Sequence, residues 1–179
     1  FDGALVSRHP PHGWSHRPSP VDELHACQER LGEVEQAAPK GARWLWLIGN
    51  HDERWERFLA TKIPEFANLN GMRLSDHFPG WEMAWSCFVN RASLDPVFIM
   101  HDYANGVHSG YNNTLKAGKT IVTGHLHKLQ VTPWRDYNGR RYGVDTGTLA
   151  EPYGEQFTYC EGNPVNWCSG FCVLTFKDG

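Results

Sequence analysis

The sequence predicts an α/β fold in a single domain that spans residues 1–179. Short apolar runs at 43–48, 97–100 and 120–123 are typical of buried strands. Segments with helical periodicity lie between these runs. A hydrophobic content of 40% in 179 residues is enough to build a substantial core.

The first regular element predicted is a helix that begins at Pro20. Residues 3–20 contain too much proline and glycine for a regular element. Ser19 is suited to cap a helix, because Pro20 follows it directly and Asp22 lies three residues later. Apolar residues then recur at helical spacing and predict one buried face, formed by Leu24, Cys27, Leu31, Val34 and Ala38.

The middle of the chain is predicted to alternate strands and helices. The run at 43–48 stops at Gly49-Asn50-His51-Asp52, and a helix is expected over 53–61. A strand is expected over 81–89. The run at 97–100 is a further strand, which stops at His101-Asp102.

The last part of the chain is predicted to be mainly β. A helical stretch at 111–117 leads into the strand at 120–123, which stops at Gly124-His125-Leu126-His127. The further strands expected are 129–134, 140–144 and 171–176, with turns at Asn138-Gly139 and Gly162-Asn163.

Polar side chains therefore follow three predicted strands, where open α/β sheets usually place their ligand sites. These side chains are Asn50 and His51, then His101, then His125 and His127. Imidazole suits zinc, manganese, iron or nickel, and an asparagine carbonyl suits a five- or six-coordinate ion better than tetrahedral zinc. If the segment from His125 to His127 is extended, its two rings point the same way, which suits two neighbouring ions.

Two four-residue motifs carry a family resemblance. Gly49-Asn50-His51-Asp52 and Gly124-His125-Leu126-His127 resemble, in the same order, the G-N-H-[DE] and G-H-x-H motifs of calcineurin-like metallophosphoesterases. His101 resembles the isolated metal-binding histidine of that family, and residues 144–148 resemble its N-x-G-S-like segment. The short connections resemble those of small bacterial or phage members. The resemblance implies a sandwich of two mixed β-sheets flanked by helices, here lacking its first strand or strands.

The resemblance also implies an activity and a role for each residue. Asn50, His101 and His125 would bind one divalent ion and His127 a second, with Mn²⁺ favoured over Fe, Zn, Ni or Mg. His51 would be the catalytic histidine, and Asp52 would orient its ring. A hydroxide bridging the two ions would attack phosphorus, so the implied enzyme hydrolyses phosphate monoesters or diesters.

The sequence departs from the family pattern at its start. The D-x-H motif is absent, and so is G-D-x-x-D as a whole. Asp2 fits either as the last aspartate of that second motif, which we favour, or as its metal-bridging aspartate. We expect the first metal-binding segment to lie upstream of Phe1, and this stretch alone to load metal poorly and to be inactive. Asp102 stands where the family has glycine, and it is equally suited to supporting a ligand or to a solvated turn.

Composition leaves several substrates open. Seventeen basic and 20 acidic residues give a net charge of −3, so no global cationic field favours nucleic acid, although metal ions can supply local charge. A phosphate ester is the expected substrate, and nucleic acid is one candidate. The alternatives are a nuclease of the same superfamily and a catalytically impaired binding module. An amidohydrolase or a metallo-β-lactamase-like enzyme fits worse, because Lys128-Leu129-Gln130 follows the H-x-H segment.

Some chemically suggestive residues have an ordinary structural interpretation. His9, His12 and His16, with Arg8 and Arg17, could contact phosphate, but a solvated loop is favoured. Arg140 and Arg141 are expected to decorate an exposed hairpin. The five cysteines are expected to be reduced, and a zinc or disulfide cluster of Cys160, Cys168 and Cys172 is less favoured. Without an 18-residue apolar run or a signal peptide, we expect a soluble, cytoplasmic protein that does not bind membranes.

Overall fold

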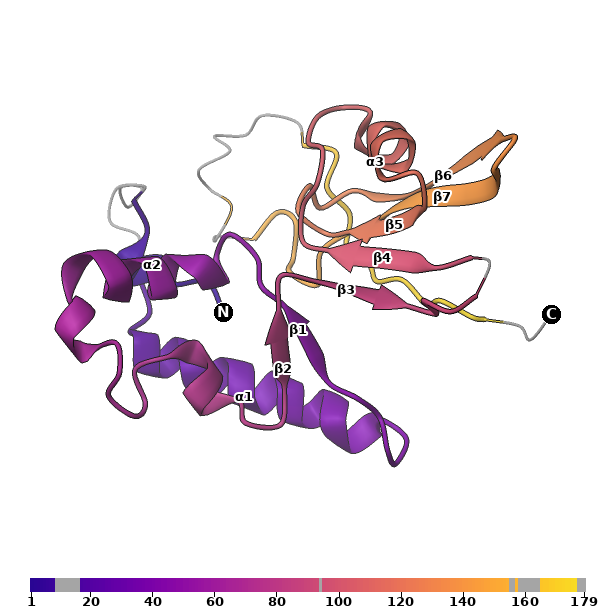
Figure 1. Cartoon of the computed structure of the whole chain (residues 1–179). Coiled ribbons are helices and arrows are strands. Elements are labelled where there is room, and N and C mark those ends of the chain that lie inside the picture. Colours follow the sequence, from indigo (N-terminus) through magenta and orange to yellow (C-terminus); the bar gives the residue numbers. More distant parts are fainter. Residues whose placement is uncertain (9–16, 94, 155–156, 158–164, 177–179) are drawn as a thin grey trace. The chain divides into compact units, whose positions relative to one another are not determined.

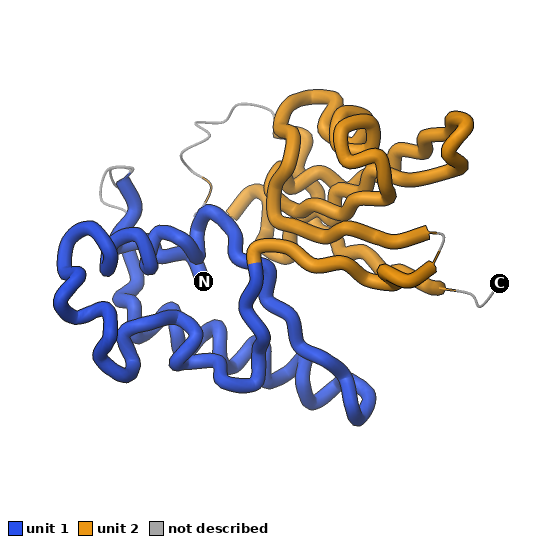
Figure 2. Tube along the Cα trace, viewed as in Figure 1, with its two compact units in different colours: residues 1–84 blue, residues 85–179 orange. Residues whose placement is uncertain are grey.

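The computed structural model describes residues 1–8, 17–93, 95–154, 157 and 165–176. The chain divides into two compact units, unit 1 from Phe1 to Ala84 and unit 2 from Trp85 to Gly179 (Figure 2). Each unit contains a β-sheet and at least one helix (Figure 1), so the predicted α/β class is confirmed. No helix in the described part of the chain is long and apolar enough to cross a bilayer.

Helix α1 (Pro20–Ala37) begins where the sequence predicts. Ser19 Oγ accepts a hydrogen bond from the Asp22 backbone N–H at 3.2 Å, and Asp22 Oδ2 accepts one from the Ser19 N–H at 3.2 Å. The expected apolar face is only partly covered, because Val34 is 51% exposed. A helix of 18 residues is roughly 27 Å long, whereas the strands of unit 1 are three residues, or roughly 10 Å, long.

The sheet of unit 1 consists of two parallel strands, β1 (Leu45–Leu47) and β2 (Glu82–Ala84). The first is shorter than the predicted run at 43–48. Trp46 on β1 packs against Phe78 with ring centroids 4.9 Å apart, and against Trp81 at 6.3 Å. These aromatic rings therefore contribute to the core of the unit.

Helix α2 (Asp52–Lys62) follows β1 and confirms the helix expected over 53–61. Three 3₁₀ turns complete unit 1, and they were not predicted: η1 (Ala4–Val6), η2 (Pro64–Phe66) and η3 (Leu74–His77). Leu59 on α2 is 1% exposed and Leu74 on η3 is 2% exposed, so they anchor these segments in the core of the unit.

Unit 2 is built on a five-stranded sheet in the order β3-β4-β5-β7-β6. Strands β4 (Val97–Met100), β5 (Thr120–Thr123) and β7 (Gly139–Thr146) are parallel, while β3 (Ser86–Val89) and β6 (Leu129–Asp136) are antiparallel edge strands. The expected strand over 81–89 is divided at Trp85 into β2 and β3, which belong to different sheets. The periodicity of apolar residues cannot predict this division, because both halves are extended strands.

The two faces of this sheet are covered differently. Val97, Val122 and Val144 form the core on one face, where Cys172 and Leu174 pack on them. On the other face lies α3 (Ser109–Ala117), which begins two residues earlier than predicted. A Cβ on Gly143 of β7 would collide with the carbonyl group of Gly110 on α3, so glycine permits this close helix–strand approach.

The strand expected over 171–176 is absent from the structure. Those residues pair with no strand, and only an isolated bridge joins Ser169 to Thr148. Alternating burial is nevertheless present, because Cys172 and Leu174 face the core while Phe171 and Val173 are more than 70% exposed. The alternation in sequence thus reflects packing on the sheet, without the ladder of hydrogen bonds that defines a strand. The turn expected at 162–163 lies outside the described residues.

Candidate active site

The turn after β1 brings several predicted site residues together in unit 1. Asn50 is exposed and His51 is half-buried, whereas Asp52, the first residue of α2, is 8% exposed. Asp52 Oδ2 accepts hydrogen bonds from the Gly49 backbone N–H at 2.9 Å and from Trp46 Nε1 at 3.1 Å. The Asp52 carboxylate therefore closes the turn between strand and helix.

Asp2, and not Asp52, is the carboxylate bonded to the His51 ring. Asp2 Oδ1 makes a short contact with His51 Nδ1, and Arg54 Nη1 donates to the same oxygen at 3.1 Å and to the Asp2 carbonyl at 3.0 Å. The resemblance assigns Asp52 to orienting the His51 ring, whereas the ring contact in the structure is with Asp2 and Asp52 Oδ2 is used in the turn. The hydrogen bond with His51 lowers the pKa of Asp2, and burial only partly opposes this effect.

A buried carboxylate of α1 holds the segment that carries Asp2. Glu23 is 9% exposed, and its two oxygens accept hydrogen bonds from the consecutive backbone N–H groups of Asp2 (3.2 Å), Gly3 (2.7 Å) and Ala4 (2.9 Å). Gly3 has a φ of 61°, which glycine adopts at little cost. No local pattern in the sequence indicates this role for Glu23, because a glutamate in the first turn of a helix is ordinarily solvated.

Two of the predicted metal ligands meet in unit 2. His101 follows β4 and His125 follows β5, and these strands are parallel, so their carboxyl ends lie at the same edge of the sheet. His101 Nε2 and His125 Nδ1 form a hydrogen bond of 3.0 Å, and the ring centroids are 5.0 Å apart. The His101 carbonyl also accepts hydrogen bonds from the N–H groups of Gly124 and His125, both at 3.1 Å. This pairing confirms that the two strand ends converge.

His127 is placed differently from the expectation. Residues 125–126 form a turn and His127 has a φ of 58°, so the H-x-H segment is not extended and the argument from a common side-chain direction does not apply. The His127 ring packs edge-on against Trp167 at 4.9 Å and against Phe157 at 5.7 Å. The Cys168 N–H donates to the His127 carbonyl at 2.9 Å and fixes the segment that carries Trp167.

Asp145 is a buried acid on β7 near the same edge of the sheet. It is 1% exposed and is paired in register with Thr123, the last residue of β5. Burial raises the pKa of Asp145 to about 6, while the positive charge of Lys128 acts in the opposite direction. Asp102, by contrast, is exposed.

The four predicted metal ligands are divided between the two units. Asn50 belongs to unit 1, while His101, His125 and His127 belong to unit 2. Within the described residues, no three His, Cys, Asp or Glu side chains are grouped as metal ligands. His9, His12, His16 and Cys160 lie outside the described residues. The four described cysteines, Cys27, Cys87, Cys168 and Cys172, are free thiols.

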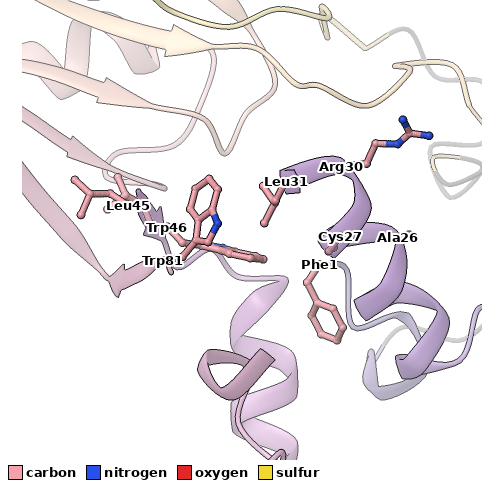
Figure 3. A pocket seen from close by; sticks show the side chains of 9 residues that line it. Phe1, Ala26, Cys27, Arg30, Leu31, Leu45, Trp46 and Trp81 are labelled. Atoms are coloured by element: carbon pink, nitrogen blue, oxygen red, sulfur yellow. The ribbon is translucent and has the colours of Figure 1, made fainter. Parts of the chain in front are cut away.

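A hollow in unit 1 is mainly apolar and is lined by none of the predicted site residues. It has a volume of about 470 Å³ and lies between α1 and β1, where Leu31, Trp46 and Trp81 line it together with Phe1 (Figure 3). Among the described residues, Arg30 is the only charged side chain that lines it, so these residues provide no acid–base pair there.

Comparison of the chain with known proteins gave no match. No protein-family model matches the sequence, no curated protein is similar to it, and no solved structure resembles it. The sequence motifs and the positions of the site residues are therefore the basis for assigning a function.

Proposed function

We propose that this chain belongs to a metal-dependent hydrolase of phosphate monoesters or diesters, of the calcineurin-like metallophosphoesterase type. The observation that carries the proposal is the 3.0 Å separation of His101 Nε2 and His125 Nδ1. Two nitrogens that each lie about 2.1 Å from one ion, at right angles, are about 3.0 Å apart. The histidine pair therefore fits adjacent positions around a single octahedral ion such as Mn²⁺.

The remaining metal ligands are assigned from the motifs. Asn50 would bind the same ion as the histidine pair, and His127 would bind a second ion. When bound, the two divalent ions would supply the positive charge that activates water and stabilises the phosphoryl oxygens.

His51 would act on the leaving group of the phosphate ester. Because Nδ1 is bonded to Asp2, Nε2 is the ring nitrogen left for the substrate, and it would donate a proton or a hydrogen bond to the leaving oxygen. Asp2 holds the orientation of the ring, and Arg54 holds Asp2. A carboxylate bonded to one ring nitrogen thus orients the histidine for acid–base chemistry at the other ring nitrogen.

The proposal is tested by separating metal binding from catalysis. In the full-length natural protein, Mn²⁺ affinity is measured by calorimetry, and hydrolysis of bis(p-nitrophenyl) phosphate and p-nitrophenyl phosphate is followed with Mn²⁺ present. His101→Ala and His125→Ala should each weaken Mn²⁺ binding at least about tenfold, because a ligand is lost. His51→Ala should lower kcat at least about a hundredfold and leave Mn²⁺ affinity unchanged.

His25→Ala is the matched control, because His25 is an exposed histidine on α1. It should leave both Mn²⁺ affinity and kcat at the wild-type values. Equal Mn²⁺ affinity for His101→Ala and His25→Ala would exclude the metal site, and full hydrolysis by His51→Ala would exclude its catalytic role.

A further inference from the structure

The β6–β7 hairpin of unit 2 carries an unusual pair of like charges. Strand β5 pairs only with residues 143–145 of β7, so residues 139–142 and their partners on β6 extend beyond β5 (Figure 1). On this free part of the hairpin, Arg135 lies directly opposite Arg140. Like charges in directly opposed positions destabilise an antiparallel ladder.

The arginine pair is not neutralised by the protein around it. Neighbouring Arg141 is bound through both terminal nitrogens by Asp136, at 2.9 and 2.8 Å. In contrast, Arg135 and Arg140 are exposed, and among the described residues no carboxylate forms a salt bridge with either of them. Two exposed arginines are thus placed directly opposite each other, where an anion would relieve the repulsion between their charges.

An apolar and aromatic surface adjoins the arginine pair. Pro133 pairs with Tyr142 on the next rung of the same face, because alternate residues of a strand point to the same side. Pro133 is exposed, whereas Tyr142 is half-buried and packs partly against the valine core of the sheet. The two rungs are about 7 Å apart. Together with Trp134, these four residues line a hollow of about 520 Å³.

This combination matches the chemistry of a nucleotide unit. Guanidinium groups bind phosphate oxygens through paired, charge-assisted hydrogen bonds. Flat aromatic and proline surfaces accept a base with little regard to its identity. We propose that this face of the hairpin binds single-stranded nucleic acid, with a backbone phosphate between Arg135 and Arg140 and a base against the rung of Pro133 and Tyr142. The site does not depend on the proposed hydrolysis.

The test measures binding alone. A fluorescein-labelled oligo(dT) of ten nucleotides is titrated with the protein, and fluorescence anisotropy measures the affinity. EDTA is present so that metal-dependent hydrolysis does not occur. The double variant Arg135→Gln with Arg140→Gln should bind at least about tenfold more weakly at 50 mM salt. The slope of log affinity against log salt should decrease by about 0.7, because one phosphate is no longer neutralised.

The control variant makes the same change of charge elsewhere. Arg43→Gln with Arg57→Gln removes two exposed arginines of unit 1, which pair with Glu82 and Glu53. It should keep both the affinity and the salt slope of the wild-type protein. Equal loss in the two double variants would show an effect of net charge only and would overturn the proposal, as would the absence of oligonucleotide binding by the wild-type protein.

Two competitors examine the ligand class. An abasic oligonucleotide of the same length should compete at least about threefold less well than oligo(dT), because it lacks the stacked base. Polyglutamate of equal charge should compete poorly. If polyglutamate or the abasic strand competes as well as oligo(dT), the hairpin is a general polyanion surface and the proposed nucleic-acid site is wrong.

Discussion

The carboxylate of Glu23 offers a sharp test of how unit 1 is held together. Replacing it with alanine removes the acceptor of three consecutive backbone N–H groups, of which the Gly3 N–H is buried. A hydrogen bond to a charged group contributes about 1.5–3 kcal/mol, and a buried donor without a partner costs about 1–3 kcal/mol. Because the Asp2 and Ala4 donors are only partly buried and can bind water, we expect Glu23→Ala to lower the free energy of unfolding by about 2–4 kcal/mol.

Urea denaturation followed by tryptophan fluorescence measures this change. Trp55 is a suitable reporter, because its ring contacts Phe1 at a centroid distance of 6.4 Å. Glu23→Gln keeps one acceptor oxygen and should fall between Glu23→Ala and the wild type. Glu29→Ala, on an exposed position of the same helix, should stay within about 0.5 kcal/mol of the wild type. If Glu23→Ala is as stable as Glu29→Ala, the three hydrogen bonds do not hold the segment.

Three further predictions concern other parts of the structure. Gly143→Ala should lower the free energy of unfolding of unit 2 by about 3 kcal/mol or more in urea denaturation, because its Cβ would collide with the backbone of α3. A decrease below about 1 kcal/mol would show that the helix can move away. Burial raises the pKa of Asp145 from its ordinary 3.8 to about 6, so the unfolded chain releases this proton first and stability should fall as pH rises from about 4 to 6, by roughly 3 kcal/mol. Asp145→Asn should remove this fall in unfolding experiments between pH 4 and 7, and an unchanged pH profile would contradict the assignment. The pKa of Asp2 is lowered by its hydrogen bond with His51, so the stabilisation by this pair is present above about pH 4 and is lost as pH falls through the lowered pKa. In unfolding experiments at pH values below about 4, Asp2→Asn should therefore lose less stability than the wild type does.

Local patterns in the sequence were sufficient to predict the positions of several helices and strands. The cap formed by Ser19 and Asp22 set the start of α1, and the apolar runs at 97–100 and 120–123 coincide with β4 and β5. These elements depend on interactions within a few residues or on continuous apolar character, which the sequence displays directly. The meeting of His101 and His125 followed from the same reasoning, because parallel strands place their carboxyl ends at one edge.

Hydrogen bonds between residues far apart in the sequence could not be predicted from local patterns. The partner of the His51 ring is 49 residues away at Asp2, and the anchor of that segment is Glu23. The motif suggested the neighbouring Asp52, but its oxygen is needed to close the turn at Gly49. Which of two nearby carboxylates reaches a ring depends on the path of the backbone.

The sequence by itself determined the α/β class, the N-terminal cap of α1 and the convergence of two histidines, since each depends on short-range order or on strand direction. Only the tertiary structure decided that the run over 81–89 serves two sheets, that residues 171–176 pack on the core without joining a ladder, and that Arg135 and Arg140 face each other. The physical reason is that pairing register and buried hydrogen bonds are set by the whole fold, because each one joins residues whose proximity no local pattern encodes.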